Sequence, residues 1–538
     1  MRSFIRSTLL LLALMLSATA TAHDFEVDGI YYNINGNEAT VTCNSSSPYG
    51  TYSGAVVIPA TVTYNRTTYP VTSIGSRAFY YCTDLTSIVI PNSVKVIGES
   101  AFYNCSGLTS IVIPNLVTSI DDWTFAGCTG LTSIVIPNSV TEIGEFAIYR
   151  CSRLTSIVIP NSVTEIGLEA FYGCSGLTSI NIPNSVTAIG YGAFGECSGL
   201  TSIVIPNSLT AIGESAFVGC SGLTSIVVES GNPRYDSRNN CNAIIETADN
   251  TLIRGCNNTI IPNTITVIGS SAFSYCSGLT SIVIPNSVTA IGSSAFSRCT
   301  GLSSIVIPNS VTYINDWTFT GCSGLTSIDI PNSVTTIGYM AFTGCSGLTS
   351  IVIPNSVTAI DHFAFKDCSG LTGIDIPNSV TSIGKEAFAA CTGLANVIIP
   401  NSVTAIGNKA FCGCTGLKDV YCYIADISRV SIEYDIFYLE DYNYSGRTLH
   451  VLQGTADDYQ WWNDVDWSWC FENVVDDLIP ETLSGDVNGD RVVNIVDVNA
   501  VISVVLGDNH IPAADVNGDG SVNITDINAV INIILRGT

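Results

Sequence analysis

Two short segments near the C-terminal end carry evenly spaced oxygen-bearing side chains. "DVNGDRVVNIVD" runs from Asp486 to Asp497, and "DVNGDGSVNITD" runs from Asp515 to Asp526. In each segment Asp or Asn occupies positions 1, 3, 5, 9 and 12, which is the ligand spacing of a calcium-binding loop. Calcium is a hard cation that takes six to eight oxygen ligands. The sequence therefore predicts two bound Ca²⁺ ions.

Ten side chains and two backbone carbonyls make up the predicted ligand sets. The first set is Asp486, Asn488, Asp490, Asn494 and Asp497 with the carbonyl of Val492, and the second is Asp515, Asn517, Asp519, Asn523 and Asp526 with the carbonyl of Ser521. The loops differ at position 6, where Arg491 stands in the first and Gly520 in the second. Because a guanidinium beside the cation opposes binding, we expect the first site to be weaker.

A helix is expected to follow each loop and to hold its last ligand in place. The segments "VNAVISVVLG" and "INAVINIILRG" place apolar residues three and four positions apart. The two apolar stripes are Val498, Val501, Ile502 and Val505, and Ile527, Val530, Ile531 and Ile534. We expect these stripes to face each other in a small all-α domain.

The duplicated loop and helix, without the first helix of an EF-hand, resembles a type I dockerin domain over residues 483–538. The resemblance implies calcium-dependent docking to a cohesin-like protein partner. It also assigns partner recognition to the pairs Ile495 and Val496, and Ile524 and Thr525, where dockerins often have Ser-Thr. The identity of the partner is therefore left open.

Most of the chain before this domain is one repeated phrase. Its cysteines fall 23 residues apart in two series, Cys82, Cys105, Cys128, Cys151, Cys174, Cys197 and Cys220, then Cys276, Cys299, Cys322, Cys345, Cys368, Cys391 and Cys414. A fixed period of 20 to 29 residues with apolar positions at i, i+3 and i+5 is typical of a leucine-rich repeat solenoid. A single repeat cannot bury its own core, so stacked neighbours must do so.

The phrase that begins at Cys276 predicts which side chains face the core. The residues expected to point inward are Leu279, Ile282, Ile284, Val288, Ile291, Ala295 and Phe296, and those expected outward are Thr280, Ser281 and Val283. Pro285 should end the strand because it has no N–H group to donate. The segment "SSAFSR" is expected to form a helical turn.

The repeated unit resembles the BspA-like leucine-rich repeat family of bacterial surface proteins. The resemblance covers residues 71–425 and implies an α/β solenoid, a right-handed superhelix with a parallel sheet on one face. It also predicts an N-terminal β-rich cap at 23–70, an irregular insertion at about 228–260 and a C-terminal cap at 426–480. Such proteins are associated with adhesion to host proteins and to other cells, which this chain would then share.

The aligned cysteines are interpreted as buried structural thiols. Stacked equivalent side chains run parallel about 5 Å apart, whereas a disulfide needs convergent Cβ atoms roughly 3.5–4.5 Å apart. Outside the ladder, pairing of Cys241 with Cys256 and of Cys422 with Cys470 stays open for an exported protein.

Several departures from the consensus mark positions where the solenoid surface changes. Asn181, Asp329 and Asp375 replace the outward valine, and Trp123 and Trp317 replace smaller residues. Trp is favoured at binding hot spots, but packing on a neighbouring turn explains it equally well. The group Trp461, Trp462, Trp467 and Trp469 is either a sugar-stacking platform or the buried part of the C-terminal cap, and burial is favoured.

Composition and the N-terminus place the protein outside the cytoplasm. Arg2 and Arg6 precede the apolar run Leu9–Leu16 and small residues that end at Ala22, which predicts a bacterial secretory signal peptide at 1–22. We therefore expect a secreted or cell-surface protein without a transmembrane segment, which would need about 20 apolar residues. A formal net charge of −26 argues against nucleic acid as a partner.

The sequence offers no candidate catalytic residues. Its four histidines, His23, His362, His450 and His510, lie in unlike segments, so no nucleophile and base can be paired. We therefore predict a non-catalytic protein whose solenoid binds a host or cell-surface protein or a glycan. The alternative is a non-catalytic carbohydrate-binding component of a polysaccharide-degrading complex.

Overall fold

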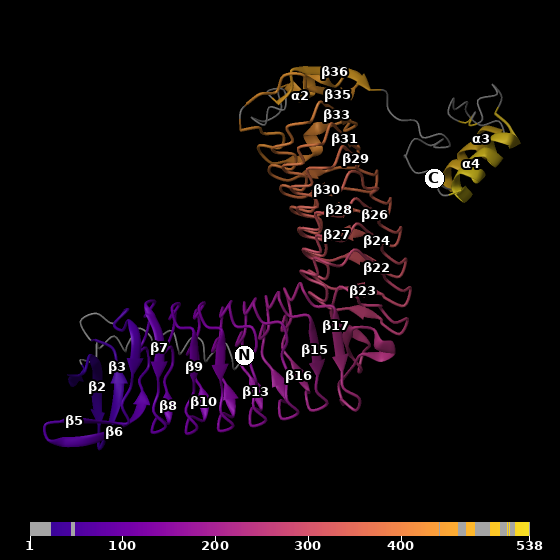
Figure 1. Ribbon diagram of the computed structural model, residues 1–538. Helices are drawn as coiled ribbons and strands as arrows, with labels where there is room; N and C mark the ends of the chain where they lie inside the picture. The colour runs from indigo at the N-terminus through magenta and orange to yellow at the C-terminus, as the bar shows by residue number, and fades with distance from the viewer. Residues whose placement is uncertain are drawn as a thin grey trace. The chain divides into compact units, whose positions relative to one another are not determined.

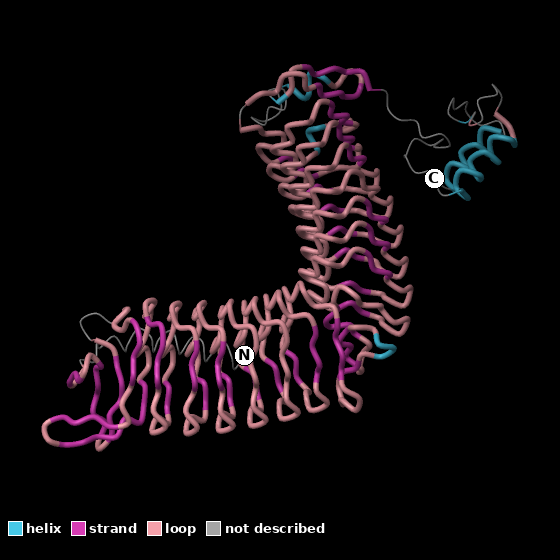
Figure 2. Tube along the Cα trace, in the orientation of Figure 1, coloured by secondary structure: helices cyan, strands magenta, loops and turns pink. Residues whose placement is uncertain are grey.

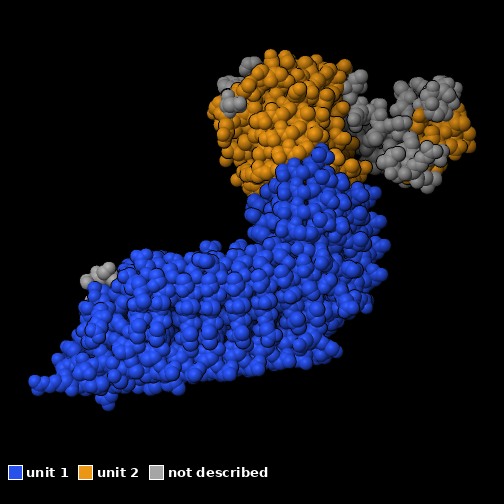
Figure 3. Space-filling model, in the orientation of Figure 1, with its two compact units in different colours: residues 1–349 blue, residues 350–538 orange. Residues whose placement is uncertain are grey.

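The computed structural model describes most of the repeat region and parts of the C-terminal domain. The described residues are 23–44, 49–440, 442–460, 470–478, 495–505, 514, 516 and 522–536. The chain forms two compact units, residues 1–349 and residues 350–538 (Figure 3). Each unit is described separately below.

The first unit begins with short strands that cover the open end of the core. Strands β1 (Phe25–Val27), β2 (Ile30–Asn35) and β3 (Glu38–Thr42) form an antiparallel meander. Strand β3 then pairs in parallel with β6 (Thr67–Ile74), which also pairs antiparallel with β5 (Thr61–Tyr64). Tyr32 and Val41 are fully buried in this segment, so it shields the first repeat from solvent.

The repeats of this unit stack through two rows of short parallel strands (Figure 2). One row is β4 (Gly54–Val57), β7 (Leu85–Val89), β9 (Ser110–Val112), β11 (Ser133–Val135), β15 (Ser202–Ile205), β17 (Ser225–Val228), β22 (Ser281–Val283), β24 (Ser304–Val306) and β26 (Ser327–Asp329). The other is β8 (Val96–Ile97), β10 (Ser119–Ile120), β12 (Glu142–Ile143), β13 (Glu165–Ile166), β14 (Ala188–Ile189), β16 (Ala211–Ile212), β21 (Val267–Ile268), β23 (Ala290–Ile291), β25 (Tyr313–Ile314) and β27 (Thr336–Ile337). Within the regular repeats paired residues are 23 positions apart, as Ser110 and Ser133 are, whereas β4 and β7 pair residues 31 or 32 positions apart.

The segment between the two rows forms consecutive turns, where the sequence predicted a helical turn. In the repeat around Phe296, the N–H groups of Ser294, Phe296 and Arg298 donate to carbonyls of the next repeat at 2.6–2.9 Å. The alternating N–H groups donate three residues back within the same repeat. Because half of the N–H groups bond along the stack, an α-helix cannot form here. The leucine-rich repeat solenoid is confirmed, and its described repeats contain little helix.

An insertion separates the two series of repeats. Strands β18 (Tyr235–Asp236), β19 (Ala243–Glu246) and β20 (Thr251–Gly255) form an antiparallel sheet, with the 3-10 helix η1 (Arg238–Asn240) between β18 and β19. Strand β20 then pairs in parallel with β21, so the insertion rejoins the stack in register. The Arg254 side chain is buried and donates to the carbonyls of Ser271 and Ser274 at 3.2 Å, which fastens the insertion to the next repeat.

The second unit continues the same architecture and ends in a pair of helices. Its strands are β28 (Ala359–Ile360), β29 (Gly373–Asp375), β30 (Ser382–Ile383), β31 (Asn396–Ile399), β32 (Ala405–Ile406), β33 (Asp419–Cys422), β34 (Ser431–Ile432), β35 (Thr448–Leu452) and β36 (Asn473–Leu478). Its helices are η2 (Ile427–Arg429), α2 (Ala456–Gln460), α3 (Ile495–Val505) and α4 (Ile524–Arg536). Strands β29, β31, β33, β35 and β36 form one parallel sheet, so the row continues beyond the last regular repeat.

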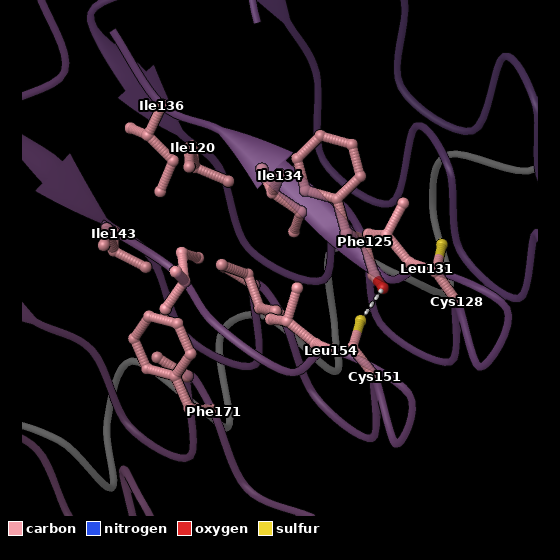
Figure 4. Close-up of a cluster of buried hydrophobic side chains, with 14 of the residues drawn as sticks. Ile120, Phe125, Cys128, Leu131, Ile134, Ile136, Ile143, Cys151, Leu154 and Phe171 are labelled. Atoms are coloured by element: carbon pink, nitrogen blue, oxygen red, sulfur yellow. Dashed lines mark hydrogen bonds between the residues drawn. The ribbon is translucent and has the colours of Figure 1, made fainter. Parts of the chain in front are cut away.

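The core consists of the side chains that the repeat pattern placed inside. In the repeat that begins at Cys276, Leu279, Val288 and Phe296 are buried, whereas the outward Val283 is 82% exposed. Figure 4 shows the equivalent leucines, isoleucines and phenylalanines of neighbouring repeats packed against one another. Successive phenylalanines stack nearly parallel, with Phe296 5.1 Å from Phe273 and 5.6 Å from Phe319 between ring centroids. Each repeat therefore supplies one layer of a continuous core.

The ladder cysteines are buried thiols that tie adjacent repeats together. The thiol of Cys151 donates to the carbonyl oxygen of Phe125 at 3.2 Å, as drawn in Figure 4, and Cys299 donates to Phe273 at 3.1 Å. The same bond recurs in most repeats between residues 26 positions apart. A buried carbonyl thus gains a donor that alanine would not supply. Cys241, Cys256 and Cys422 are also free thiols, so neither of the two pairings left open occurs in this structure.

Replacing one stacked ring tests how strongly the core depends on it. We expect Phe296→Ala to lower the free energy of unfolding by about 3–5 kcal/mol, because it opens a cavity between two stacked rings. Urea unfolding followed by circular dichroism measures the change. Ser281→Ala, at an exposed strand position of the same repeat, is the matched control and should stay within about 0.5 kcal/mol. A loss below 1 kcal/mol for Phe296→Ala would contradict the layered core.

The buried thiols should make the solenoid sensitive to alkali. Burial raises the pKa of Cys174, Cys322 and Cys414 from 9.0 to about 12. Above pH 9 the unfolded chain releases thiol protons that the folded chain keeps, so the free energy of unfolding should fall between about pH 9 and pH 12. Urea midpoints across this range measure the slope. Cys174→Ser should make it shallower, because a hydroxyl does not ionise in this window, whereas an unchanged slope would be evidence against the prediction.

Candidate functional site

Helices α3 and α4 each carry the last predicted ligand of one calcium loop. Helices α3 and α4 pack through Val498, Val501 and Val530, which are buried together with Ala514. Ile502, Ile527 and Ile531 are partly buried against this cluster. The predicted stripes therefore meet, except at their ends, where Val505 is 39% exposed and Ile534 is 37% exposed. At the end of α3 the residue that packs against the cluster is Val504, which the predicted stripe did not include.

Both helices start three residues earlier than the apolar stripes indicated, and this places a carboxylate in each first turn. Asp497 lies in the first turn of α3 and Asp526 in the first turn of α4, and both are fully buried. At the start of α4, the Asp526 carboxylate accepts a hydrogen bond from the N–H of Asn523 at 2.8 Å. The Asn523 side-chain oxygen in turn accepts the N–H of Thr525 at 2.9 Å. This reciprocal capping box fixes two predicted ligands at position 9 and position 12 of the second loop.

The donor set at these helix starts fits a divalent cation. A carboxylate removed from water is costly unless a cation or several donors compensate it, and Asp497 and Asp526 are both fully buried. The other predicted ligands, Asp486, Asn488, Asp490, Val492, Asn494, Asp515, Asn517, Asp519 and Ser521, lie outside the described residues. Within the described part of the chain, no three His, Cys, Asp or Glu side chains cluster as a metal site. Bound calcium would supply charge compensation for the two buried carboxylates.

The predicted partner-reading positions occupy the same two helix starts. Ile524 and Thr525 are exposed in the first turn of α4, and Ile524 is 67% exposed. Ile495 and Val496 form the equivalent first turn of α3, and their side chains lie outside the described residues.

The solenoid surface carries the consensus departures where the sequence placed them. Asn181, Asp329 and Asp375 are exposed on the outer side of the sheet. Trp123 stacks on Phe146 with ring centroids 4.0 Å apart, and the Trp317 indole N–H donates to the sulfur of Met340 at 3.2 Å. Both tryptophans therefore pack against neighbouring turns, which was the alternative to a binding hot spot. The tryptophans at 461, 462, 467 and 469 lie outside the described residues.

The sequence reasoning missed a cluster of side chains around a single histidine near the end of the solenoid. His450 on β35 lies 2.9 Å from Asp477 on β36 and 3.4 Å from Asp419 on β33, and it stacks on Tyr421 with centroids 4.6 Å apart. The 23-residue spacing of cysteines ends at Cys414, before these three strands begin. No repeat period therefore indicated that these residues lie on one face of the sheet. The cluster joins the last three strands of the sheet by side-chain contacts.

Comparison with known proteins matches both parts of the chain. The BspA type leucine-rich repeat region matches residues 61–175, 142–247, 252–369 and 340–443 in six copies, and the dockerin type I domain matches residues 484–535. No curated protein matches this sequence. No described helix has the length and apolar character needed to span a membrane.

Several solved structures resemble the repeat region. A leucine-rich cell surface protein from Faecalibacterium prausnitzii is 31% identical, covering 74% of this chain and 94% of its own, with a TM-score of 0.52. A leucine-rich repeat protein from Bacteroides ovatus is also 31% identical, covering 78% and 99%, with a TM-score of 0.44. The pneumococcal vaccine antigen PcpA is 18% identical, covering 84% and 98%, with a TM-score of 0.46. This chain belongs to the BspA type leucine-rich repeat proteins and carries a type I dockerin domain.

Proposed function

We propose that this protein is a secreted or surface-bound adhesion and binding protein whose C-terminal domain docks it to a cohesin-like partner. The solenoid displays a protein- or glycan-binding surface, and the dockerin domain attaches that surface to the partner when calcium is bound. The observation that carries the proposal is the pairing of a repeat stack with two helix starts that each bury a carboxylate, one of which is capped. Both families are non-catalytic, which supports a binding role.

The proposal assigns calcium a structural role in the docking domain. Each loop brings oxygen ligands to the start of a helix, and the buried carboxylates of Asp497 and Asp526 need a compensating charge. Without the ion, these two carboxylates and the other carboxylate ligands of the loops repel one another. The packing of α3 against α4 is then lost. Metal binding and folding are then coupled, and the partner-reading residues are displayed only in the calcium-bound state.

Calcium titration tests the ligand assignment. We expect the full-length protein to bind two Ca²⁺ ions by isothermal titration calorimetry, and Asp526→Ala to bind one, because the buried carboxylate of the second loop is lost. Asp497→Ala with Asp526→Ala should bind none. Asp375→Ala, which removes an exposed carboxylate from the solenoid sheet, is the control and should leave both sites intact. Unchanged stoichiometry in the double variant would exclude the proposed ligand sets.

The exposed aliphatic residue at the start of α4 tests the docking role. We expect Ile524→Ser to weaken capture by a panel of immobilised type I cohesin modules at least tenfold, since an apolar contact is removed from the proposed interface. Surface plasmon resonance in calcium and in chelator measures the effect. Ile534→Ser, at the exposed far end of the same helix, is the matched control and should bind as the native protein does. Capture that persists in chelator would argue against calcium-dependent docking.

The alternative function is a non-catalytic carbohydrate-binding component of a polysaccharide-degrading complex. Dockerin domains serve such complexes, and a polar cavity in the first unit, described below, has the lining expected for a glycan. The two functions differ in the ligand of the solenoid. Binding to immobilised extracellular-matrix proteins favours adhesion, and binding to plant or host polysaccharides favours the alternative.

A further inference from the structure

The first unit contains a large polar cavity where its stack changes direction. Figure 1 shows the stack bending near the insertion that contains β18–β20. Residues from repeats on both sides of this insertion line the cavity, which holds about 860 Å³. Its volume lies within the range of small-molecule binding pockets, about 300–1,000 Å³. The lining consists of Ser, Thr and Gly residues together with Arg150, Glu196, Tyr275 and Arg298, and it includes no aliphatic side chain. The cavity therefore suits a hydrophilic ligand rich in hydroxyl groups.

The four large lining residues occupy a backbone position that favours glycine. Each stands directly before the ladder cysteine of its repeat, where φ is +54° at Arg150, +53° at Glu196, +62° at Tyr275 and +57° at Arg298. Other repeats that line the cavity have glycine there, at Gly173, Gly219, Gly321 and Gly344. L-residues with side chains rarely adopt this left-handed conformation. Tyr81, Asn104, Asp367 and Ala390 hold the same conformation in repeats away from the cavity, so the conformation belongs to the repeat. What distinguishes the cavity is the chemistry of the side chains that stand at this position.

Glycines in the next repeat make room for these side chains. A Cβ atom added at Gly173 would lie 3.0 Å from Cγ of Arg150, and one added at Gly219 would lie 3.0 Å from Cγ of Glu196. At Gly321 the added Cβ would lie 3.1 Å from Cγ of Arg298. The large residue and the following glycine thus form a repeated pair, in which the side chain lies across the glycine.

The two arginines present positive charge at the cavity wall. Both are exposed, and each guanidinium lies over a tyrosine ring, at 5.1 Å from the Tyr149 centroid for Arg150 and 5.2 Å from the Tyr275 centroid for Arg298. Neither takes part in an ion pair among the described residues. In a chain with a formal net charge of −26, two exposed arginines that line one cavity favour an anionic ligand group.

We propose that this cavity binds an acidic oligosaccharide, a sugar chain that carries carboxylate groups. Arg150 and Arg298 pair with the carboxylates through their planar fork of donors, while Glu196 and the Ser and Thr hydroxyls bond the sugar hydroxyls. Protein partners usually anchor on apolar pockets, which this lining does not provide. The inference rests on the proposed function and names the ligand class of the solenoid.

Calorimetry on the full-length protein tests the site with two acidic glycans, polygalacturonate and polysialic acid. Comparing the two shows whether the site binds the carboxylate of a uronate or of a sialate. Dextran is the neutral control, and poly-L-glutamate probes an acidic peptide ligand. We expect Arg150→Gly with Arg298→Gly to weaken binding of the acidic glycan at least tenfold at 50 mM NaCl. Because glycine relieves the left-handed strain, the melting temperature of this variant should be unchanged or higher. Arg153→Ala, on the same repeat but outside the lining, should change affinity less than twofold.

Each of the following outcomes would overturn the proposal. Equal binding of dextran would exclude recognition through the carboxylate, and equal binding of poly-L-glutamate would assign the cavity to an acidic peptide segment. Failure of both acidic glycans to bind, or an unchanged affinity in the double glycine variant, would remove the site. Cohesin capture by the same double variant is measured in parallel, so a failure of the cavity is distinguished from a failure of the docking module.

Discussion

The structure depends on hydrogen bonds that run along the stack from one repeat to the next. In the buried turn before each cysteine, alternate N–H groups donate to carbonyls of the following repeat, and most ladder thiols donate to the phenylalanine carbonyl of the preceding repeat. These groups have no water to bond in the core, so each must find its partner in a neighbouring copy. A repeat on its own would expose an apolar layer and leave these groups unpaired. This is why the copies are nearly identical and why both ends need a different segment.

That constraint decides where binding residues can stand. Inward positions are committed to leucine, isoleucine, phenylalanine and cysteine, since a change there disturbs two neighbouring layers. Outward strand positions accept substitutions, as Asp329 and Asp375 show. The left-handed position before each cysteine also accepts them, although a side chain there costs about 1–2 kcal/mol relative to glycine. Arg150 and Arg298 stand at this position and line the cavity.

The docking domain uses a different physical principle. Its described core is small, with only Val498, Val501, Ala514 and Val530 buried, and it includes two buried carboxylates at the helix starts. Metal coordination stabilises many small domains, and type I dockerin domains as a family bind calcium. The repeats stabilise one another, whereas the proposed role of calcium would make the docking domain depend on an ion.

The sequence by itself determined the repeat period, the inward side chains such as Leu279 and Phe296, the buried cysteine ladder and the loop–helix plan of the docking domain. These features repeat at fixed spacing, and spacing along the chain decides which face of a strand or helix a residue occupies. Only the tertiary structure decided the turn conformation, the thiol–carbonyl bonds, the contact of His450 with Asp419 and Asp477, and the cavity around Arg150 and Arg298. Those contacts join residues from different repeats, and the direction of the stack at the insertion sets which repeats share a cavity. Neither property can be inferred from local pattern, because both arise only when the copies are stacked.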